Sequence, residues 1–243
     1  MTPDDTPWSS DESEAVISRY ETRLRAYGFS EESLGWGKKG RQQLRFAVLA
    51  SQWDLRGKAV LDLGAGFGDF YSFAKPMNLR EYLGIDVTPG LVATGNDRYG
   101  DESAFQLKLG SVTDESLYRE CDVAVISGLF NFRLRNGRNR EFISTVLRLA
   151  FKFSRLGVAC NFVTDRVDFR DPLIHYQSPA EVLEIASDLT KNVTLKQDYM
   201  PFEYSVFLDR RDCFSPEIAI FSHLDPTSRK GREFSSGHQT ESN

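Results

Sequence analysis

The fold of this chain is decided by residues 60–69, which read VLDLGAGFGD. An apolar run here carries one acidic residue, Asp62, and passes into a loop with glycine at every second position. A second apolar run comes later and ends at another acidic residue, Asp86. Glycines let the backbone turn tightly and approach a ligand, and a carboxylate after the second strand can bind both ribose hydroxyls. The layout therefore predicts a nucleotide-binding βαβ unit.

The kind of nucleotide is indicated by the details of this loop. A dinucleotide fingerprint reads G-x-G-x-x-G, but Asp69 stands where its third glycine belongs and Gly68 breaks the spacing. Asp62 places a negative charge beside the loop, which repels a pyrophosphate and suits a cationic ammonium or sulfonium group. The pattern resembles motif I of the class I S-adenosylmethionine-dependent methyltransferases, D-x-G-x-G-x-G, followed by the acidic residue of motif II. An ordinary strand and helix joined by a glycine-rich turn is the alternative.

Length and composition indicate one globular domain with short appendages. The chain has 243 residues, of which 40% are hydrophobic and 27% charged, and its net charge is −5. This charge offers no overall basic field for nucleic acid or anionic membranes. The sequence has no apolar run of transmembrane length and its acidic start is unlike a signal peptide, so a cytoplasmic protein is expected. The widely spaced Cys121, Cys160 and Cys213 predict buried thiols rather than disulfides or a zinc site.

The periodicity along the chain predicts a doubly wound α/β sheet. Two helical stripes, in 12–27 and 39–52, precede the glycine loop, and strands then alternate with helices. The expected parallel strands are 59–63, 81–86, 104–109, 122–127 and 157–163. Two further strands, 192–197 and 203–209, are joined by a segment too short for a helical crossover, so they must be antiparallel. This resembles the Rossmann-like, seven-stranded methyltransferase sheet, mostly parallel with a C-terminal antiparallel hairpin, in the order 3-2-1-4-5-7-6.

The same pattern divides the chain into four parts. We expect a flexible N-terminus in 1–10, N-terminal helices that act as a lid or substrate segment in 11–55, the cofactor-binding domain in 56–210, and a partly disordered C-terminal extension in 211–243. In open α/β sheets the ligand binds beyond the carboxyl ends of the strands, near the point where the strand order reverses. The site is therefore expected between the ends of the first and fourth strands.

The resemblance implies S-adenosylmethionine as the cofactor and gives the first two motifs their roles. The glycine loop would face the methionine end of the cofactor, and Asp86 would hold the ribose hydroxyls. Val87, the next residue, would pack on the adenine ring. The loop residues assigned in this way are Asp62, Gly64, Ala65 and Gly66.

Four further residues are assigned to the cofactor with less help from the motifs. After the third strand the family often has an acidic residue that binds the adenine amino group, whereas this chain has Ser111 and Val112, which puts that contact in doubt. Ser127 ends the fourth strand, where small residues permit close approach of the cofactor. Trp36 stands between glycines in a basic loop and is either a lid over the cofactor or substrate or a core plug.

The methyl acceptor is constrained by the segment after the fourth strand. Adenine-N6 and glutamine methyltransferases carry [DN]-P-P-[YF] there, whereas residues 127–132 read SGLFNF, which argues against amino-group chemistry on DNA or glutamine. The strand ends without a carboxylate, so no metal is expected. Four arginines lie in 133–140, at a helix start whose dipole disfavours cations, and they favour an anionic ligand. We assign Arg133, Arg135 and Asn131 to the substrate, with a solvated basic turn as the alternative.

A proton acceptor, where the reaction needs one, is expected in 165–176. His175 is the natural base because its pKa lies near neutrality, and Tyr176 and Asp165 are lesser candidates. A surface histidine satisfied by water is the alternative.

These features predict a stand-alone methyltransferase that acts on a small anionic metabolite by direct in-line displacement. Its expected partner is a small molecule, with neither nucleic acid nor membrane. The alternatives are a noncatalytic S-adenosylmethionine-binding or regulatory module, and a methyltransferase that acts on a protein or RNA through the arginine loop.

Overall fold

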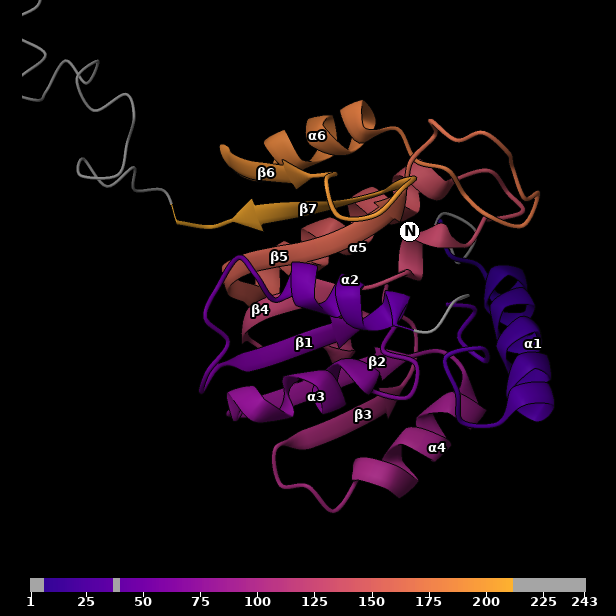
Figure 1. Ribbon diagram of the computed structural model, residues 1–243, viewed down its shortest axis with the longest axis vertical. Coiled ribbons are helices and arrows are strands. Elements are labelled where there is room, and N and C mark those ends of the chain that lie inside the picture. Colours follow the sequence, from indigo (N-terminus) through magenta and orange to yellow (C-terminus); the bar gives the residue numbers. More distant parts are fainter. Residues whose placement is uncertain (1–6, 37–39, 212–243) are drawn as a thin grey trace, which may run out of the picture. The chain divides into compact units, whose positions relative to one another are not determined.

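The computed structural model describes residues 7–36 and 40–211 of the chain. Its centre is a sheet of seven strands in the order β3-β2-β1-β4-β5-β7-β6 (Figure 1). The strands are β1 (Ala59–Leu63), β2 (Glu81–Asp86), β3 (Phe105–Leu109), β4 (Cys121–Ile126), β5 (Ser154–Val163), β6 (Asn192–Lys196) and β7 (Glu203–Asp209). Neighbours among β1 to β5 pair in parallel, and β7 is antiparallel to both β5 and β6. The predicted fold class, strand order and antiparallel hairpin are confirmed.

Helices connect these strands at nearly the predicted places. They are α1 (Ser10–Tyr27), α2 (Arg41–Leu49), α3 (Asp69–Ala74), α4 (Pro89–Tyr99), α5 (Asn139–Phe153) and α6 (Pro179–Ser187), with short 3-10 turns η2 (Lys75–Met77), η3 (Glu115–Leu117) and η4 (Leu129–Asn131). Among the strands, the largest difference is at β5, which begins at Ser154 rather than at residue 157, whereas the ends of the other strands differ from the prediction by at most one residue. Ser154 already pairs with Cys121 through the backbone, although the next side chain, Arg155, is exposed. The apolar pattern alone does not mark such a start.

Two apolar layers cover the faces of the sheet. Alternate residues of β1 illustrate the division, since Leu61 packs with α5 and α6 whereas Val60 packs with α2 and α3. Side chains of a strand point to opposite faces in turn, so a strand covered on both sides reads as one continuous apolar run. The two layers leave only the ends of the strands for a ligand.

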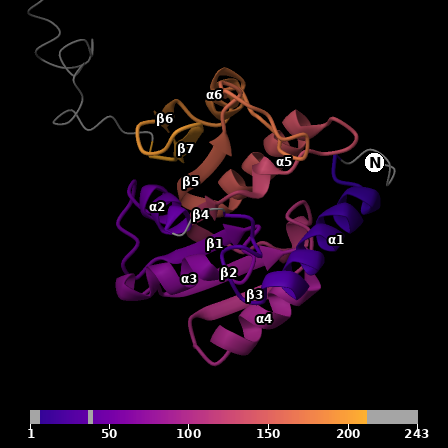
Figure 2. The same ribbon diagram turned by 45° about the vertical axis from the view of Figure 1, so that its right-hand side comes forward.

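The helix α1 lies beyond the carboxyl ends of the parallel strands (Figures 1 and 2), and its Val16 packs in the same layer as Leu61. Carboxylates near its two ends hold it there. Glu12 Oε1 accepts a hydrogen bond from the Asn136 amide at 3.0 Å, and Glu21 Oε1 accepts one from the Gly90 amide, in the first turn of α4, at 2.7 Å. The helix thus crosses the edge of the sheet where a ligand is expected.

The thiols, membrane spans and metal ligands can be traced within the described residues. Cys121 and Cys160 are buried free thiols, as predicted, and Cys213 lies outside the described residues. Within 7–36 and 40–211, no helix is both long and apolar enough to cross a membrane. The same ranges contain no group of three or more His, Cys, Asp or Glu side chains that could hold a metal ion. The proposed C-terminal extension and most of the N-terminal segment 1–10 also fall outside the description, although Trp8 stacks on Phe142.

Candidate active site

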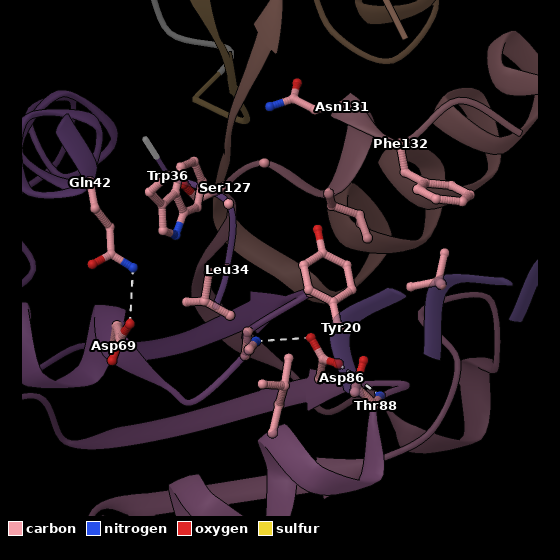
Figure 3. A pocket seen from close by; sticks show the side chains of 18 of the residues that line it. Tyr20, Leu34, Trp36, Gln42, Asp69, Asp86, Thr88, Ser127, Asn131 and Phe132 are labelled. Atoms are coloured by element: carbon pink, nitrogen blue, oxygen red, sulfur yellow. Dashed lines mark hydrogen bonds between the residues drawn. The ribbon is translucent and has the colours of Figure 1, made fainter. Parts of the chain in front are cut away.

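A pocket at the carboxyl edge of the sheet brings together most of the residues predicted to bind the cofactor (Figure 3). Its walls come from α1, the segment around Trp36, α2, the glycine loop and the ends of β2 and β4. The predicted cofactor residues that line it are Trp36, Asp62, Gly64, Ala65, Gly66, Asp86, Val87, Val112 and Ser127. Ser111 does not line it, and its hydroxyl lies 2.8 Å from the Thr113 hydroxyl instead.

The glycine loop reaches the pocket because its backbone adopts conformations that other residues avoid. Gly64 and Gly66 have φ values of +73° and +58°, in the left-handed region. The space above them is also small, since a Cβ at Gly64 would lie 3.0 Å from Leu129 Cδ1 and one at Gly66 would lie 3.0 Å from Leu34 Cδ2. Glycine is therefore required here both by conformation and by close approach of the neighbouring wall.

The carboxylate of Asp86 is held rigidly at the floor of the pocket. Its Oδ2 accepts a hydrogen bond from the Gly66 amide at 2.9 Å, and its Oδ1 accepts one from the Thr88 amide at 2.8 Å. Burial raises the pKa of Asp86, and these two amides oppose that shift by favouring the charged form. Each carboxylate oxygen keeps a further lone pair, so the group can still accept hydrogen bonds from a ligand.

Asp62 lies beside the same loop in a drier environment. The Tyr82 hydroxyl donates to Asp62 Oδ2 at 2.6 Å, and burial raises the pKa of Asp62 to about 7 against the effect of that hydrogen bond. A nearby ligand cation would stabilise the ionised carboxylate and lower this pKa again. The site is thus suited to a positively charged group.

Trp36 covers the end of β4. Its ring lies against Gly128, where a Cβ would stand 2.5 Å from Trp36 Cη2, and the Arg45 guanidinium lies 4.6 Å from the ring centroid. Arg45 in turn donates to both carboxylate oxygens of Glu203, with an Nε–Oε2 distance of 2.7 Å. Trp36 therefore forms part of the pocket wall and packs on Arg45, which also lines the pocket, and its role as a lid stays a prediction.

The opposite side of the pocket is built by two loops that pair with each other. An antiparallel bridge joins Phe132 to Ile174, and the His175 amide donates to the Asn131 carbonyl at 2.9 Å. The pairing brings Asn131, Phe132 and Ile174 to the pocket. Figure 3 shows Asn131 and Phe132 across the pocket from Asp86. Asn131 Oδ1 is buried there with no hydrogen-bond partner among the described residues.

The three predicted proton acceptors lie in this second loop but do not line the pocket. His175 Nε2 lies 2.9 Å from Gln177 Oε1, and burial lowers the His175 pKa, so the ring is neutral at pH 7. The Tyr176 hydroxyl accepts from the Asp171 amide at 2.7 Å, and Asp165 Oδ1 lies 3.4 Å from the Thr164 hydroxyl. Each candidate is engaged within its own loop.

The predicted arginine cluster is also outside the pocket lining. Arg133 and Arg135 are exposed. Arg138 pairs with Glu141, and Arg140 pairs with Glu184 at 3.1 Å. These acidic partners explain how cations are tolerated at the start of α5, where the helix dipole disfavours them.

A different arginine does line the pocket. Arg19, on α1, has its guanidinium 6.0 Å from the centroid of the Phe132 ring and makes no hydrogen bond or ion pair within the described residues. Sequence reasoning recognised the apolar stripe of this helix, which contains Tyr20, but not that the helix crosses the strand ends. The stripe signals a buried face without identifying what that face covers.

Comparisons with known proteins agree with the sheet and the glycine loop. No protein-family model matches the chain. A protein of Mycobacterium tuberculosis, Rv1506c, whose methyltransferase name is provisional, is 27% identical over 157 residues, which are 62% of this chain and 92% of the relative. A ribosomal protein L11 methyltransferase of Actinobacillus pleuropneumoniae is 32% identical over 83 residues, but these are only 28% of that protein.

Two solved structures illustrate the likeness of the fold. Magnesium protoporphyrin IX methyltransferase from Synechocystis PCC 6803, with bound S-adenosylhomocysteine, superposes with a TM-score of 0.56 at 14% identity, over 81% of this chain and 97% of its own. The DhpI–SAM–HEP complex gives 0.57 at 16% identity, over 83% and 98%. At these identities the likeness shows a shared fold, and the loop motif and the mycobacterial relative carry the resemblance further.

Proposed function

We propose that this chain, which belongs to the class I S-adenosylmethionine-dependent methyltransferases, transfers the methyl group of its cofactor to a small anionic acceptor. The cofactor, S-adenosylmethionine, supplies that methyl group on a sulfonium sulfur that is already a good leaving group. The task left to the protein is to hold the acceptor in line with the bond that breaks. The observation that carries the proposal of an anion is Arg19, a guanidinium in the pocket without an ion-pair partner in the described residues.

The residues at the floor of the pocket fit the parts of this cofactor. Asp86, a buried carboxylate fixed by two backbone amides, would accept hydrogen bonds from the ribose hydroxyls. Val87 and Val112 are apolar lining residues at the neighbouring strand ends, and they would flank the adenine ring. Asp62 would lie near the cationic end, and Ser127 near the reacting end.

The balance of charged groups in the pocket favours an anionic acceptor. Arg45 is neutralised by Glu203, whereas Arg19 and Arg41 line the pocket without a hydrogen bond or ion pair among the described residues. A guanidinium matches the oxygens of carboxylate and phosphate groups. We therefore assign recognition of the acceptor's acidic group to Arg19, with Asn131 as a polar neighbour, and not to the exposed Arg133 and Arg135.

The position of α1 favours a small acceptor. This helix forms the outer wall of the pocket and is held by Glu12 and Glu21, so an acceptor that reaches the end of β4 must fit beneath it. A protein or RNA acceptor would instead meet Arg133 and Arg135 on the outside. A small molecule is favoured because Arg19 lines the pocket, whereas Arg133 and Arg135 are exposed and do not line it.

The experiment is transfer of a labelled methyl group from S-adenosylmethionine into the small-molecule, protein and RNA fractions of a cell extract. We expect label in a small molecule whose unmethylated form is acidic. With that acceptor purified, Arg19→Met should raise its Michaelis constant at least about tenfold, the cost of one charged hydrogen bond, while cofactor affinity stays unchanged. Arg25→Met is the matched control, because Arg25 is exposed on the same helix. Label in protein, in RNA or in a small molecule whose unmethylated form is neutral would contradict the proposal, and cofactor binding without transfer would indicate a noncatalytic module.

A further inference from the structure

Every carboxylate among the described residues that line the pocket already has a partner in the protein. Asp62 accepts from Tyr82 and Asp86 accepts from two amides. Asp69 accepts from Gln42 at 2.9 Å, and Glu203 is bound through both oxygens by Arg45. The described lining residues include neither histidine nor lysine. This part of the pocket therefore offers no free side chain of the kind that usually removes a proton.

The position of these carboxylates leads to the same result. Asp62 and Asp86 lie in β1 and at the end of β2, beneath the place where the cofactor must lie, so a bound cofactor separates them from the acceptor. On the acceptor side the lining includes the apolar Phe132, Val163 and Ile174, and its polar groups include Arg19 and the amide of Asn131. Tyr20 lines the pocket as well, but burial raises the pKa of its hydroxyl and makes the phenolate scarce at neutral pH.

A pocket whose described lining offers no free base restricts which atom of the acceptor can be methylated. A hydroxyl or an ammonium group must lose a proton during methyl transfer, and a positioned base normally takes it. A carboxylate or a phosphorus oxyanion has already lost its proton at neutral pH. We propose that the acceptor reacts through such an oxyanion, held beside Arg19, and that the product is an ester; this inference rests on the proposed function.

The step balances without a base. An oxygen of the oxyanion forms a bond to the methyl carbon, the carbon–sulfur bond breaks, and its electron pair stays on sulfur as a neutral thioether. No proton is released. A negative oxygen and a positive sulfur lose their charges together, and apolar walls such as Phe132 and Ile174 favour that loss, because a charge costs more than a neutral group in an apolar environment.

The test begins with the product of labelled methyl transfer, made by the whole chain with S-adenosylmethionine and the acidic acceptor fraction. Mild alkali releases volatile labelled methanol from a carboxyl methyl ester. A phosphorus monoester keeps its label under these conditions, and its titration curve lacks one acidic ionisation of the acceptor. Either result supports the inference and identifies the source of the oxyanion. A proton count in weak buffer should give none released per methyl group transferred.

A second readout does not depend on turnover. Calorimetry on the complex with S-adenosylhomocysteine should show the methylated product binding at least about tenfold more weakly than the acceptor, since its charge beside Arg19 is lost. Arg19→Met should remove most of this gap, and Arg25→Met should keep it.

Two outcomes would overturn the inference in distinguishable ways. An alkali-stable label on an acidic product that retains all its acidic ionisations, with one proton released per turnover, places the methyl group on a hydroxyl or amine. The proposed function then stands and the inference falls. Label in a macromolecule, or in a small molecule whose unmethylated form is neutral, removes both.

Discussion

The two ends of the pocket differ in how their polar groups are satisfied. At the cofactor end, Asp62 and Asp86 project from strands and are hydrogen-bonded to protein donors. At the acceptor end, Arg19 and Asn131 project from a helix and a loop, and Arg19 and Asn131 Oδ1 have no polar partner among the described residues. The first end is preorganised by the sheet, and we expect the second to be completed only when the proposed acceptor binds. Substitutions at the two ends should therefore have different signatures.

The largest expected effect is the pH dependence of stability at Asp62. Its pKa in the folded chain is about 7 against roughly 3.9 when unfolded, so the folded state binds the extra proton between these values and loses stability as pH rises through them. Asp62→Asn removes this slope, and the stability of the variant relative to the wild type should rise by up to about 4 kcal/mol from pH 4 to pH 8. Denaturant unfolding at several pH values measures it, and parallel curves for both proteins would show that Asp62 titrates normally.

The next effect is loss of cofactor affinity at Asp86. Removing a charged acceptor of hydrogen bonds costs about 1.5–3 kcal/mol, so Asp86→Ala should weaken binding of S-adenosylmethionine and S-adenosylhomocysteine roughly ten- to hundredfold. Calorimetry measures both. Asp114→Ala is the control, since Asp114 is an exposed carboxylate that caps η3. Wild-type affinity in Asp86→Ala, or preference of the wild type for NADH, would contradict the assignment of the cofactor end.

Substitutions of two arginines test which of them recognises the acceptor. Arg19→Glu should raise the acceptor's Michaelis constant at least about tenfold, and Arg133→Glu should change it far less, because only Arg19 of the two lines the pocket. Cofactor affinity should be unchanged in both variants. A larger increase in the Michaelis constant for Arg133→Glu than for Arg19→Glu would instead assign recognition of the acceptor to the arginine loop after β4.

The smallest effect concerns the contact between Trp36 and the end of β4. Gly128→Ala places a methyl group 2.5 Å from the Trp36 ring and should displace it, shifting tryptophan fluorescence and weakening the cofactor severalfold. Gly137→Ala is the matched control, because its φ of +73° resembles the +76° of Gly128 but its Cβ would meet nothing within 4 Å. Both variants should lose about 1 kcal/mol through backbone strain alone. Equal fluorescence and cofactor affinity in the two would mean that Trp36 is not part of the wall.

The sheet and the cofactor end were predictable because their signals are local. Strand periodicity, the glycine spacing and the acidic residue at the end of β2 each lie within a few residues, and strand ends converge by the rules of parallel sheets. The acceptor end was not predictable in the same way. Whether Arg19 or Arg133 faces the pocket depends on where α1 crosses the sheet and on the bridge between Phe132 and Ile174, which are contacts between distant segments.

His175 and Glu203 also show that residue type alone does not reveal which side chains reach the pocket. His175 has the right chemistry for a base and lies beside a pocket residue, Ile174, but its ring turns to Gln177. Glu203 went unnoticed as part of the pocket because it reads as the polar start of an alternating strand. Its partner Arg45 lies far away in the chain, and neither residue alone signals the pair.

The bond between Arg45 and Glu203 also has a consequence for the order in which the protein matures. During synthesis α2 leaves the ribosome long before β7, and until then the Arg45 charge lacks the carboxylate that pairs with it in the folded chain. A buried charge without its partner costs several kcal/mol, so α2 cannot dock stably on a nascent chain that stops short of Glu203. Trp36 packs on Arg45, so we expect it to reach its final position only after Glu203 has been made. We therefore expect the part of the pocket wall formed by α2 and Trp36 to be completed only after β7 has been made.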